Sequence, residues 1–405
     1  MAKQVEVGSR GKDIRSDCWM ALELTDSGGI QVSLTSKVDV MFGASIIKSC
    51  EDGLRHFGVK NAKLVVEDAG ALPFTLMARL ETAVKRLHAD LKTEWLPEMQ
   101  PFCTYESTRD RFRRSRLYLP GNEPKFFINA GIHKPDGVIL DLEDSVAPSQ
   151  KDAAKILVRN ALRQVNFYGA ERMVRINQIP KGLEDLDSVV PHNVHVVLIP
   201  KCEGADDVHQ VEKRTLDLQK KHGLSSPVLF MPIIESALGA IKSYEIASAS
   251  KSVIALAVGL EDYTADIGTQ RTTEGRESFW MRSQVVNAAR AAKVQPIDTV
   301  FSDVNDMEGL RQSVLEAKSL GFEGKGCIHP RQIAVVNEAF APSEAEISRA
   351  RKIVVAFTEA ETRGLGVVAL GSKMIDPPVV KRALKTVEMA IATGKLAGNW
   401  REEEV

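Results

Sequence analysis

The sequence predicts an α/β fold: a (β/α)₈ barrel with a small α+β domain in front of it and a helical segment behind. Eight short apolar β runs follow one another between residues 116 and 330, and helix-like stretches such as KDAAKILVRNALRQV separate most of them. No Gly-rich nucleotide-binding loop is present. A doubly wound sheet is the alternative, but it usually has fewer strands and carries such a loop after the first strand.

Composition excludes several classes of partner. The 405 residues are 44% hydrophobic and 26% charged with a net charge of −1, so no global field would recruit nucleic acid or an anionic membrane. No apolar run approaches the ~20 residues of a membrane span, and the first residues lack the apolar core of a signal peptide. The five cysteines are scattered without a CxxC pair, which favours a reducing compartment, the cytoplasm.

The first hundred residues read as a separate small domain. CWMALEL (18–24) and GIQVSLTS (29–36) are strand-like with a DSGG turn between them, and the apolar spacing after them predicts a helix that stops at Gly58. AKLVVEDAG predicts a third strand and ALPFTLMARLETAVKRLH a second helix. We place this domain at 1–95 and, because LKTEWLPEMQPFCTYESTRDRF has no clean period, a linker or docking arm at 96–111.

The barrel is expected over 112–345, and 346–405 is expected to be a helical lid or oligomerisation segment. The β runs are RLYLPG (116–121), GVILDLED (137–144), RMVRIN (172–177), HVVLIPK (195–201), PVLFMPIIES (227–236), SVIALAVGLED (252–262), PIDTVFSDV (296–304) and GKGCIHP (324–330).

Charged side chains follow these runs at the end where a barrel carries its active site. They are Glu143, Asp144, Arg175, Lys201, Glu235 and Asp262. Glu235 and Asp262 follow successive strands and suit Mg²⁺, which is held by one or two carboxylates plus waters and substrate oxygens. Arg175 offers a planar fork for a substrate carboxylate. Together these groups would bind a 2-oxo or 2-hydroxy acid and stabilise an enolate or alkoxide during carbon–carbon cleavage.

Structural interpretations compete at each position. Arg175 and Glu143 could form an ion pair with no other role, and Lys201 could be a Schiff-base lysine, although pairing with a rim carboxylate is favoured. Ser115 and Asn122, near the first run, could touch a phosphate or thioester arm or simply cap a loop.

Seven motifs in order resemble the β subunit of citrate lyase, whose superfamily includes citramalyl-CoA and malyl-CoA lyases. They are RRSRLYLPGNEP, GVILDLEDSV, RIN, PK, IIES, GLEDYTADIG and GFEGKGCIHPRQI, and the resemblance covers about residues 112–395. It implies a Mg²⁺-dependent barrel that cleaves a 3-hydroxy-3-carboxyacyl thioester to a 2-oxo acid and an acyl thioester.

The resemblance also implies roles for particular residues. Glu235 and Asp262 would be metal ligands, Arg175 would hold the oxo-acid carboxylate, and Glu143 and Asp144 would orient Arg175 or metal-bound water. Asp376 in GSKMIDPPVVKRA matches an acid that malyl- and citramalyl-CoA lyases supply from a C-terminal lid to a neighbouring subunit, which implies a homotrimer.

The amino-terminal domain resembles the acyl carrier (γ) subunit of citrate lyase through RSDCWMALEL, VDVMFGASIIKSCEDGL and VEDAGALPFTLMARLETAVKRL. Ser16 stands where that family carries a phosphoribosyl-dephospho-CoA arm. The family usually has SG or SS followed by Asp, whereas Asp17 and Cys18 follow Ser16 here. The chain thus resembles a γ–β fusion, in which a tethered arm delivers its thioester at high effective concentration.

Three functions follow as alternatives. The first is a lyase for a citryl-type thioester borne by the fused carrier. The second is a lyase for free CoA thioesters, such as citramalyl-CoA, with a structural amino-terminal domain. The third is a carrier and assembly subunit that needs an acyltransferase (α-type) partner for turnover.

Overall fold

The computed structural model describes residues 4–362, 368–370 and 373–401, and it divides into two compact units, Met1–Ile333 and Ala334–Val405. Residues 363–367, 371–372 and 402–405 of the expected C-terminal segment lie outside the described residues. No helix in the described ranges is long and apolar enough to cross a membrane.

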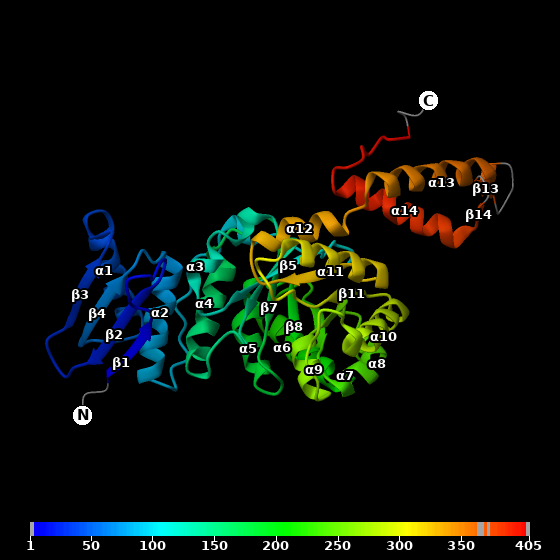
Figure 1. Ribbon diagram of the computed structural model, residues 1–405. Helices are drawn as coiled ribbons and strands as arrows, with labels where there is room; N and C mark the ends of the chain where they lie inside the picture. Colours follow the sequence, from blue (N-terminus) through cyan, green and yellow to red (C-terminus); the bar gives the residue numbers. More distant parts are fainter. Residues whose placement is uncertain (1–3, 363–367, 371–372, 402–405) are drawn as a thin grey trace. The chain divides into compact units, whose positions relative to one another are not determined.

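Eight parallel strands close into a barrel in sequence order, so the predicted barrel is confirmed (Figure 1). Each predicted run contains a strand because its apolar residues can be buried on both faces. Ile139, Met173 and Met231 belong to the cluster that packs inside the barrel. The strands are β5 Ser115–Pro120, β6 Gly137–Asp141, β7 Glu171–Arg175, β8 Val196–Ile199, β9 Leu229–Ile234, β10 Ala255–Val258, β11 Gln295–Asp298 and β12 Gly324–Cys327.

Helices follow the barrel strands and cover them (Figure 1). Helix α4 is typical: it buries Ala154, Leu157 and Ala161, spaced three or four residues apart, against the strands. The helices are α3 Pro124–Phe127, α4 Lys151–Gln164, α5 Gly182–Val189, α6 Ala205–His222, α7 Ala237–Ile241, α8 Ser243–Ser248, α9 Leu260–Asp266, α10 Arg276–Ala292, α11 Met307–Leu320 and α12 Arg331–Phe340. Short 3₁₀ turns are η1 Pro101–Cys103, η2 Ala130–His133, η3 Pro148–Gln150 and η4 Val190–His192.

The amino-terminal domain is a four-stranded sheet with the order β1-β2-β4-β3 and two helices. Strands β2 and β3, which flank the DSGG turn, do not pair with each other; β4 lies between them, antiparallel to β2 and parallel to β3. Strand β1 was not predicted. The elements are β1 Gln4–Gly8, β2 Cys18–Leu24, β3 Ile30–Ser36, α1 Asp39–His56, β4 Ala62–Asp68 and α2 Pro73–Leu87.

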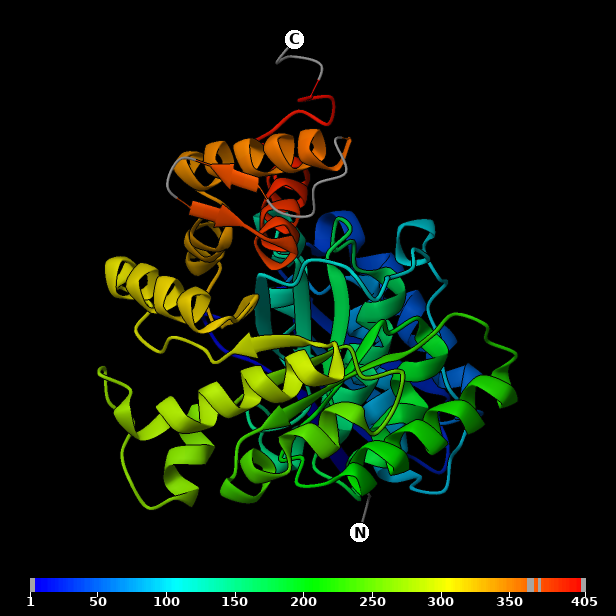
Figure 2. The same ribbon diagram turned by 90° about the vertical axis from the view of Figure 1, so that its right-hand side faces the viewer.

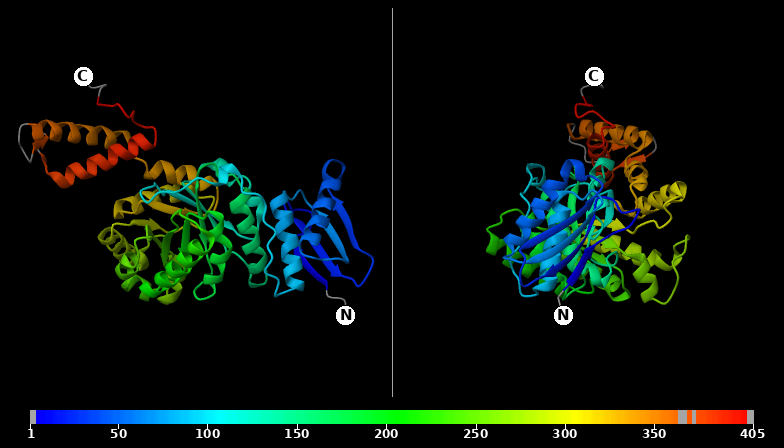
Figure 3. Two further views of the ribbon diagram at one scale, coloured as in Figure 1. Left: turned by 180° about the vertical axis from the view of Figure 1, so that it is seen from behind. Right: turned by 90° about the vertical axis from the view of Figure 1, so that its left-hand side faces the viewer.

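Helix α2 lies between this sheet and helix α4 of the barrel (Figure 3). Buried arginines cross the interface. Arg159 of α4 donates to Glu81 of α2 at 2.6 and 2.9 Å, and Arg79 of α2 donates to both carboxylate oxygens of Asp17 at 2.9 Å. Arg79 Nη2 also donates to the main-chain oxygen of Asn122, in the loop after β5, at 2.9 Å. The amino-terminal domain is therefore docked on the barrel rather than loosely linked to it.

The second unit contains two helices, α13 Glu344–Thr362 and α14 Pro377–Ala392, with a strand pair, β13 Val368–Leu370 and β14 Lys373–Ile375, beside them (Figure 2). The helices pack through Ile353, Val354, Val380 and Val387. Helix α14 begins at Pro377, because proline is tolerated in the first turn of a helix.

Candidate active site

Arg175, the last residue of β7, is held by carboxylates from the neighbouring strand exit. Its Nε and Nη2 donate to the two oxygens of Asp141 at 2.6 and 2.7 Å, and its Nη1 lies 2.9 Å from Glu143. Asp144 is farther away, at 3.7 Å, and its side chain is half exposed. An arginine has five N–H donors, so one on Nη1 and one on Nη2 stay available for a ligand.

The pKa values of Asp141 and Glu143 are shifted in opposite directions. Burial alone would raise the pKa of Asp141, but hydrogen bonds and charge from Arg175 hold that pKa below its usual range. Burial raises the pKa of Glu143, which Arg175 opposes and the nearby Asp144 reinforces. Asp141 is therefore the firm counter-ion of Arg175, and Glu143 is the carboxyl group that more readily carries a proton.

Lys201 follows β8 and is the second positively charged side chain at the rim. Its Nζ lies 3.6 Å from Glu143, 3.9 Å from Asp144 and 3.4 Å from Asp262. Partial burial would lower its pKa, but these carboxylates raise the pKa instead. A Schiff-base lysine needs a lowered pKa, so the favoured interpretation, pairing with rim carboxylates, fits this environment.

Glu235 and Asp262 both contact Lys201, one through its main chain and the other through its side chain. The main-chain nitrogen of Lys201 donates to Glu235 at 2.7 Å, while its Nζ contacts Asp262. Glu235 is 4% exposed, whereas the Asp262 side chain, in the first turn of α9, is 41% exposed. Burial raises the pKa of Glu235 to about 8; the hydrogen bond from Lys201 opposes this and the charge of Asp262 adds to it.

These two carboxylates fit a hard divalent cation. A cation beside Glu235 would remove the unfavourable burial of its charge, and carboxylate oxygens are the ligands that Mg²⁺ prefers. Across the described ranges no three or more His, Cys, Asp or Glu side chains form a ready metal-binding group. A pair of carboxylates could hold an ion that keeps several waters.

A cavity of about 450 Å³ opens at this rim and reaches into the barrel. Glycines keep it open: a Cβ on Gly259 would lie 2.3 Å from an oxygen of Glu235. Its size is typical of small-molecule sites. The lining includes Arg116, Tyr118, Asp141, Asp144, Arg175, Ile233, Glu235, Gly259, Asp262, Thr299, Val300, Gly326 and Ile328.

Three other predicted residues are not gathered at this rim, and a fourth, Asp376, belongs to the second unit. Ser115 lies at the opposite, amino end of β5, buried, and accepts a hydrogen bond from the main chain of Asp136. Asn122 does not line the cavity; its main chain faces Arg79. Ser16 precedes Asp17, half-buried, with a positive φ of 57°. Asp376, in the second unit, caps α14 by accepting from the nitrogen of Val379 at 3.2 Å.

Two cavity residues were missed by sequence reasoning as site residues. Asp141 is one of three carboxylates at the exit of the run GVILDLED, but only Glu143 and Asp144 are predicted as site residues, although Asp141 is the main partner of Arg175. Arg116 was read as part of an apolar run. The signal that could have revealed it is its spacing of two from Tyr118, since alternate residues of a strand share a face.

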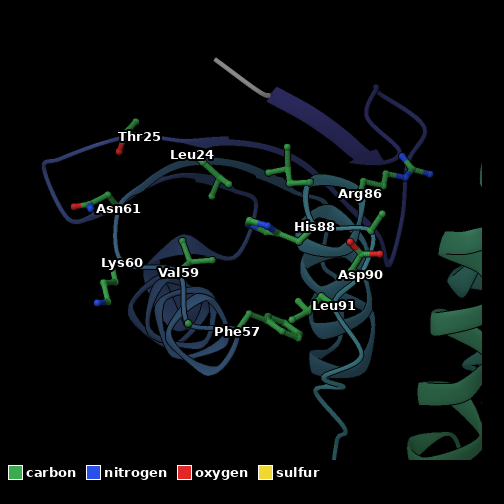
Figure 4. Close-up of a pocket in the computed structure, with 13 residues that line it drawn as sticks. Leu24, Thr25, Phe57, Val59, Lys60, Asn61, Arg86, His88, Asp90 and Leu91 are labelled. Carbon is green, nitrogen blue, oxygen red and sulfur yellow. The ribbon is translucent and has the colours of Figure 1, made fainter. Parts of the chain in front are cut away.

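A second cavity, of about 1000 Å³, lies in the amino-terminal domain (Figure 4). Leu24, Phe57, Val59 and Leu91 form its apolar side, and His88 and Asp90 are among its polar residues. It lies at the end of β2 opposite Ser16, and none of the predicted site residues lines it.

Comparison with known proteins agrees with this geometry. Residues 114–330 match the family described as HpcH/HpaI aldolase/citrate lyase, and residues 4–87 match the acyl carrier family described as malonate decarboxylase delta subunit. Citrate lyase subunit beta of Haemophilus influenzae is 41% identical over 69% of this chain and 97% of its own length. Human mitochondrial citramalyl-CoA lyase is 32% identical, over 69% of this chain and 85% of its own length.

Among solved structures, the CitE protein of Mycobacterium tuberculosis in complex with magnesium, acetoacetate and coenzyme A aligns with a TM-score of 0.58 at 30% identity, covering 70% of this chain and 99% of that one. The chain belongs to the HpcH/HpaI aldolase/citrate lyase family. The predictions of a citrate lyase β-type lyase barrel and of an acyl-carrier-like domain in front of it are confirmed.

Proposed function

We propose that the barrel is a Mg²⁺-dependent carbon–carbon lyase that cleaves a citryl-type thioester into a 2-oxo acid and an acetyl thioester. The observation that carries the proposal is the meeting, in one cavity, of an arginine with free donors and a carboxylate pair suited to a divalent cation. The structural relative with magnesium, acetoacetate and coenzyme A supports the same chemistry.

In this proposal each side chain has a definite task. Arg175, fixed by Asp141 and Glu143, binds the carboxylate on the reacting carbon through its two remaining N–H groups. Glu235 and Asp262 would hold Mg²⁺, which supplies Lewis-acid polarisation of the substrate oxygen. Lys201 holds Asp262 and Glu235 in register through its side chain and main chain.

Cleavage breaks the bond between the hydroxyl-bearing carbon and the α-carbon of the thioester. The hydroxyl proton must leave, and the electron pair passes to the thioester enolate, whose α-carbon must then be protonated. Glu143 and Asp144 stand near Arg175 as candidates to accept the first proton or to order a water. The family resemblance assigns the second transfer to Asp376 of a neighbouring subunit in a homotrimer.

We infer that the amino-terminal domain presents a thioester arm on Ser16 to the barrel. Arg79 supports this, because it pairs with Asp17, the residue after Ser16, and also donates to the main-chain oxygen of Asn122 in the loop that leaves β5 toward the rim. With the domain docked, only the phosphoribosyl-dephospho-CoA arm would move between sites, while the domain itself would remain bound to the barrel. An acyltransferase (α-type) partner would then reload the arm, and we place the assembly in the cytoplasm, where the five buried free cysteines would stay reduced.

A lyase for free CoA thioesters is the second candidate. The coenzyme A in the M. tuberculosis complex and the similarity to citramalyl-CoA lyase favour it. Intact mass measurement separates the two: an added mass on Ser16 favours the carrier function, whereas cleavage of a CoA thioester by unmodified protein favours the second candidate.

The metal requirement tests both candidates. We expect EDTA to abolish thioester cleavage, Mg²⁺ to restore it, and Glu235→Gln to remove Mg²⁺ binding measured by isothermal titration calorimetry. Full activity in excess EDTA would contradict the proposal, and trapping of Lys201 by borohydride would replace it with a Schiff-base aldolase.

A further inference from the structure

Arg116 on β5 is a buried arginine without a carboxylate partner among the described residues. It is 1% exposed, its Nη1 contacts the sulfur of Met231 at 3.1 Å, and its Nη2 reaches the main-chain oxygen of Asp298 at 3.4 Å. Its Nε has no hydrogen-bond partner. A buried charge without a partner is unfavourable, so this environment calls for an explanation.

Other buried arginines of the chain are satisfied differently. Arg79, Arg113 and Arg159 each face a carboxylate, of Asp17, Glu171 and Glu81. Arg172 has no carboxylate but donates to main-chain oxygens of Cys103, His192 and Asn193, and it does not line the cavity. Arg116 alone of these five combines an absent counter-ion with a place in the cavity wall.

The nearest carboxylate is already committed elsewhere. Asp298 accepts from Lys325 at 2.7 Å and from Arg282 at 3.1 Å, so it offers Arg116 only its main-chain oxygen. Any further negative partner for Arg116 has to come from a molecule in the cavity.

Arg116 and the rim share that cavity through Tyr118. Arg116 and Tyr118, two residues apart on β5, both line it, and the guanidinium of Arg175 lies 5.4 Å from the Tyr118 ring centre. Gly326, in register with Arg116 on the neighbouring strand β12, has no side chain, and a Cβ there would lie 2.6 Å from Val300 and 3.3 Å from Tyr118. Tyr118 and Gly326 thus both line the cavity beside Arg116.

Charge is divided unequally along this cavity. At the rim, Asp141, Glu143, Asp144, Glu235 and Asp262 outnumber Arg175 and Lys201, so an anion gains little there beyond the donors of Arg175 and a bound cation. Farther inside, Arg116 is a positive group with a free donor, and the carboxylate of Asp298, which also lines the cavity, is already paired with Lys325 and Arg282. A ligand with one carboxylate on Arg175 and a second one reaching inward would satisfy both arginines.

We propose that Arg116 binds the second carboxylate of a dicarboxylic oxo-acid unit and so determines which thioester this lyase cleaves. The inference rests on the proposed function and narrows it: a citryl thioester carries a carboxymethyl group at the reacting carbon, a citramalyl thioester carries a methyl group, and a malyl thioester carries hydrogen. Arg116 favours the citryl substrate, and hence oxaloacetate as the oxo-acid product.

Substitution of Arg116 tests this by a ratio of two substrates. Arg116→Met keeps a long side chain beside Met231 but removes the charge. We expect it to lower kcat/KM for citryl-CoA at least 30-fold and to change kcat/KM for citramalyl-CoA less than threefold, while Arg116→Lys keeps part of the preference. An equal loss on both substrates would show that Arg116 is only structural and would overturn the proposal.

A binding measurement keeps the test independent of turnover. With Mg²⁺ present, calorimetry should show that wild type binds malate at least tenfold more tightly than lactate, its counterpart without the second carboxylate. Arg116→Met should bind the two alike. If wild type already binds both alike, the proposal is wrong. If wild type discriminates but cleaves no thioester, the proposed function fails while the Arg116 subsite stands.

Thermal unfolding supplies the control for folding. Because Arg116 has no counter-ion, Arg116→Met should keep or raise Tm, whereas a purely structural arginine would lower it. Should Arg116→Met fail to fold, Arg116→Lys decides the question, because a ratio of kcat/KM for the two substrates equal to that of wild type would overturn the proposal.

Discussion

At the scale of single residues, the guanidinium of Arg175 pairs with the predicted Glu143 and also with Asp141, which the sequence did not indicate as its partner. The sequence pointed to Glu143 as the competing ion-pair partner, yet both oxygens of Asp141 occupy the Nε and Nη2 edge. This leaves the outward N–H groups free. The ion pair and the substrate-binding role are therefore compatible, because they use different donors of one side chain.

Arg175→Lys should lower kcat/KM at least 100-fold, about 2.7 kcal/mol, although the charge is kept. An ammonium group cannot reproduce the planar fork on Asp141 and at the same time reach Glu143 and a substrate. Steady-state kinetics would measure this. Arg214→Lys, at an exposed pair with Asp187, is the matched control and should be nearly neutral. Unchanged kinetics in Arg175→Lys would make Arg175 dispensable.

Gly259→Ala should weaken Mg²⁺ binding at least tenfold without unfolding the protein. Its φ of −114° suits any residue, but the new Cβ would lie 2.3 Å from an oxygen of Glu235 and displace that carboxylate. Calorimetric titration with Mg²⁺ measures the effect. Gly204→Ala, where the nearest atom is 3.9 Å away, should leave the affinity unchanged. Equal affinity in both variants would argue against Glu235 as a ligand.

At the scale of elements, the eight barrel strands could be predicted because strands covered on both faces are apolar along their whole length. Rim residues could be placed for the same reason, since each follows a recognisable run. Arg116 could not be placed in the same way, because its spacing of two from Tyr118 shows only that the two residues share a face of the strand, not that this face lines the cavity. The pairing of β2 and β3 with β4 also depends on contacts that no local pattern encodes.

The expected linker or docking arm, 96–111, is tied to the amino ends of barrel strands. The main-chain oxygen of Tyr105 lies 2.8 Å from Nε2 of His195, while Nδ1 of His195 accepts a hydrogen bond from the main-chain nitrogen of Arg172. His195 therefore binds the linker as a neutral imidazole whose Nε2 carries the proton.

Burial, helped by the charge of Arg172, lowers the pKa of His195 to about 4, so the unfolded chain binds its proton more readily than the folded chain below about pH 6.5. Stability should therefore be complete above pH 6.5 and fall by about 3 kcal/mol as pH drops to 4. Urea unfolding of wild type and His195→Asn would test this: the variant should lose less stability over that range. His222→Asn, an exposed control, should keep the wild-type slope.

At the scale of the whole molecule, Asp376 decides whether one chain is sufficient for catalysis. It caps α14 through the nitrogen of Val379, and asparagine caps helices as well as aspartate does. Asp376→Asn should therefore keep the helix and remove only the acid. The homotrimer that the family resemblance implies has this acid in a neighbour's site.

We expect Asp376→Asn to depress kcat with little change in Mg²⁺ affinity, since the acid acts on the α-carbon rather than on the metal. Glu235→Gln should be inactive because it loses a proposed Mg²⁺ ligand. Co-expressed in one cell with separate affinity tags, the two variants should form mixed oligomers that regain part of the wild-type kcat, because some sites then combine an intact Glu235 with an intact Asp376 from different chains. Each variant alone, purified in the same way, is the control. Mixed oligomers that stay inactive, with both variants folded and associated, would mean that Asp376 acts within its own chain or not at all.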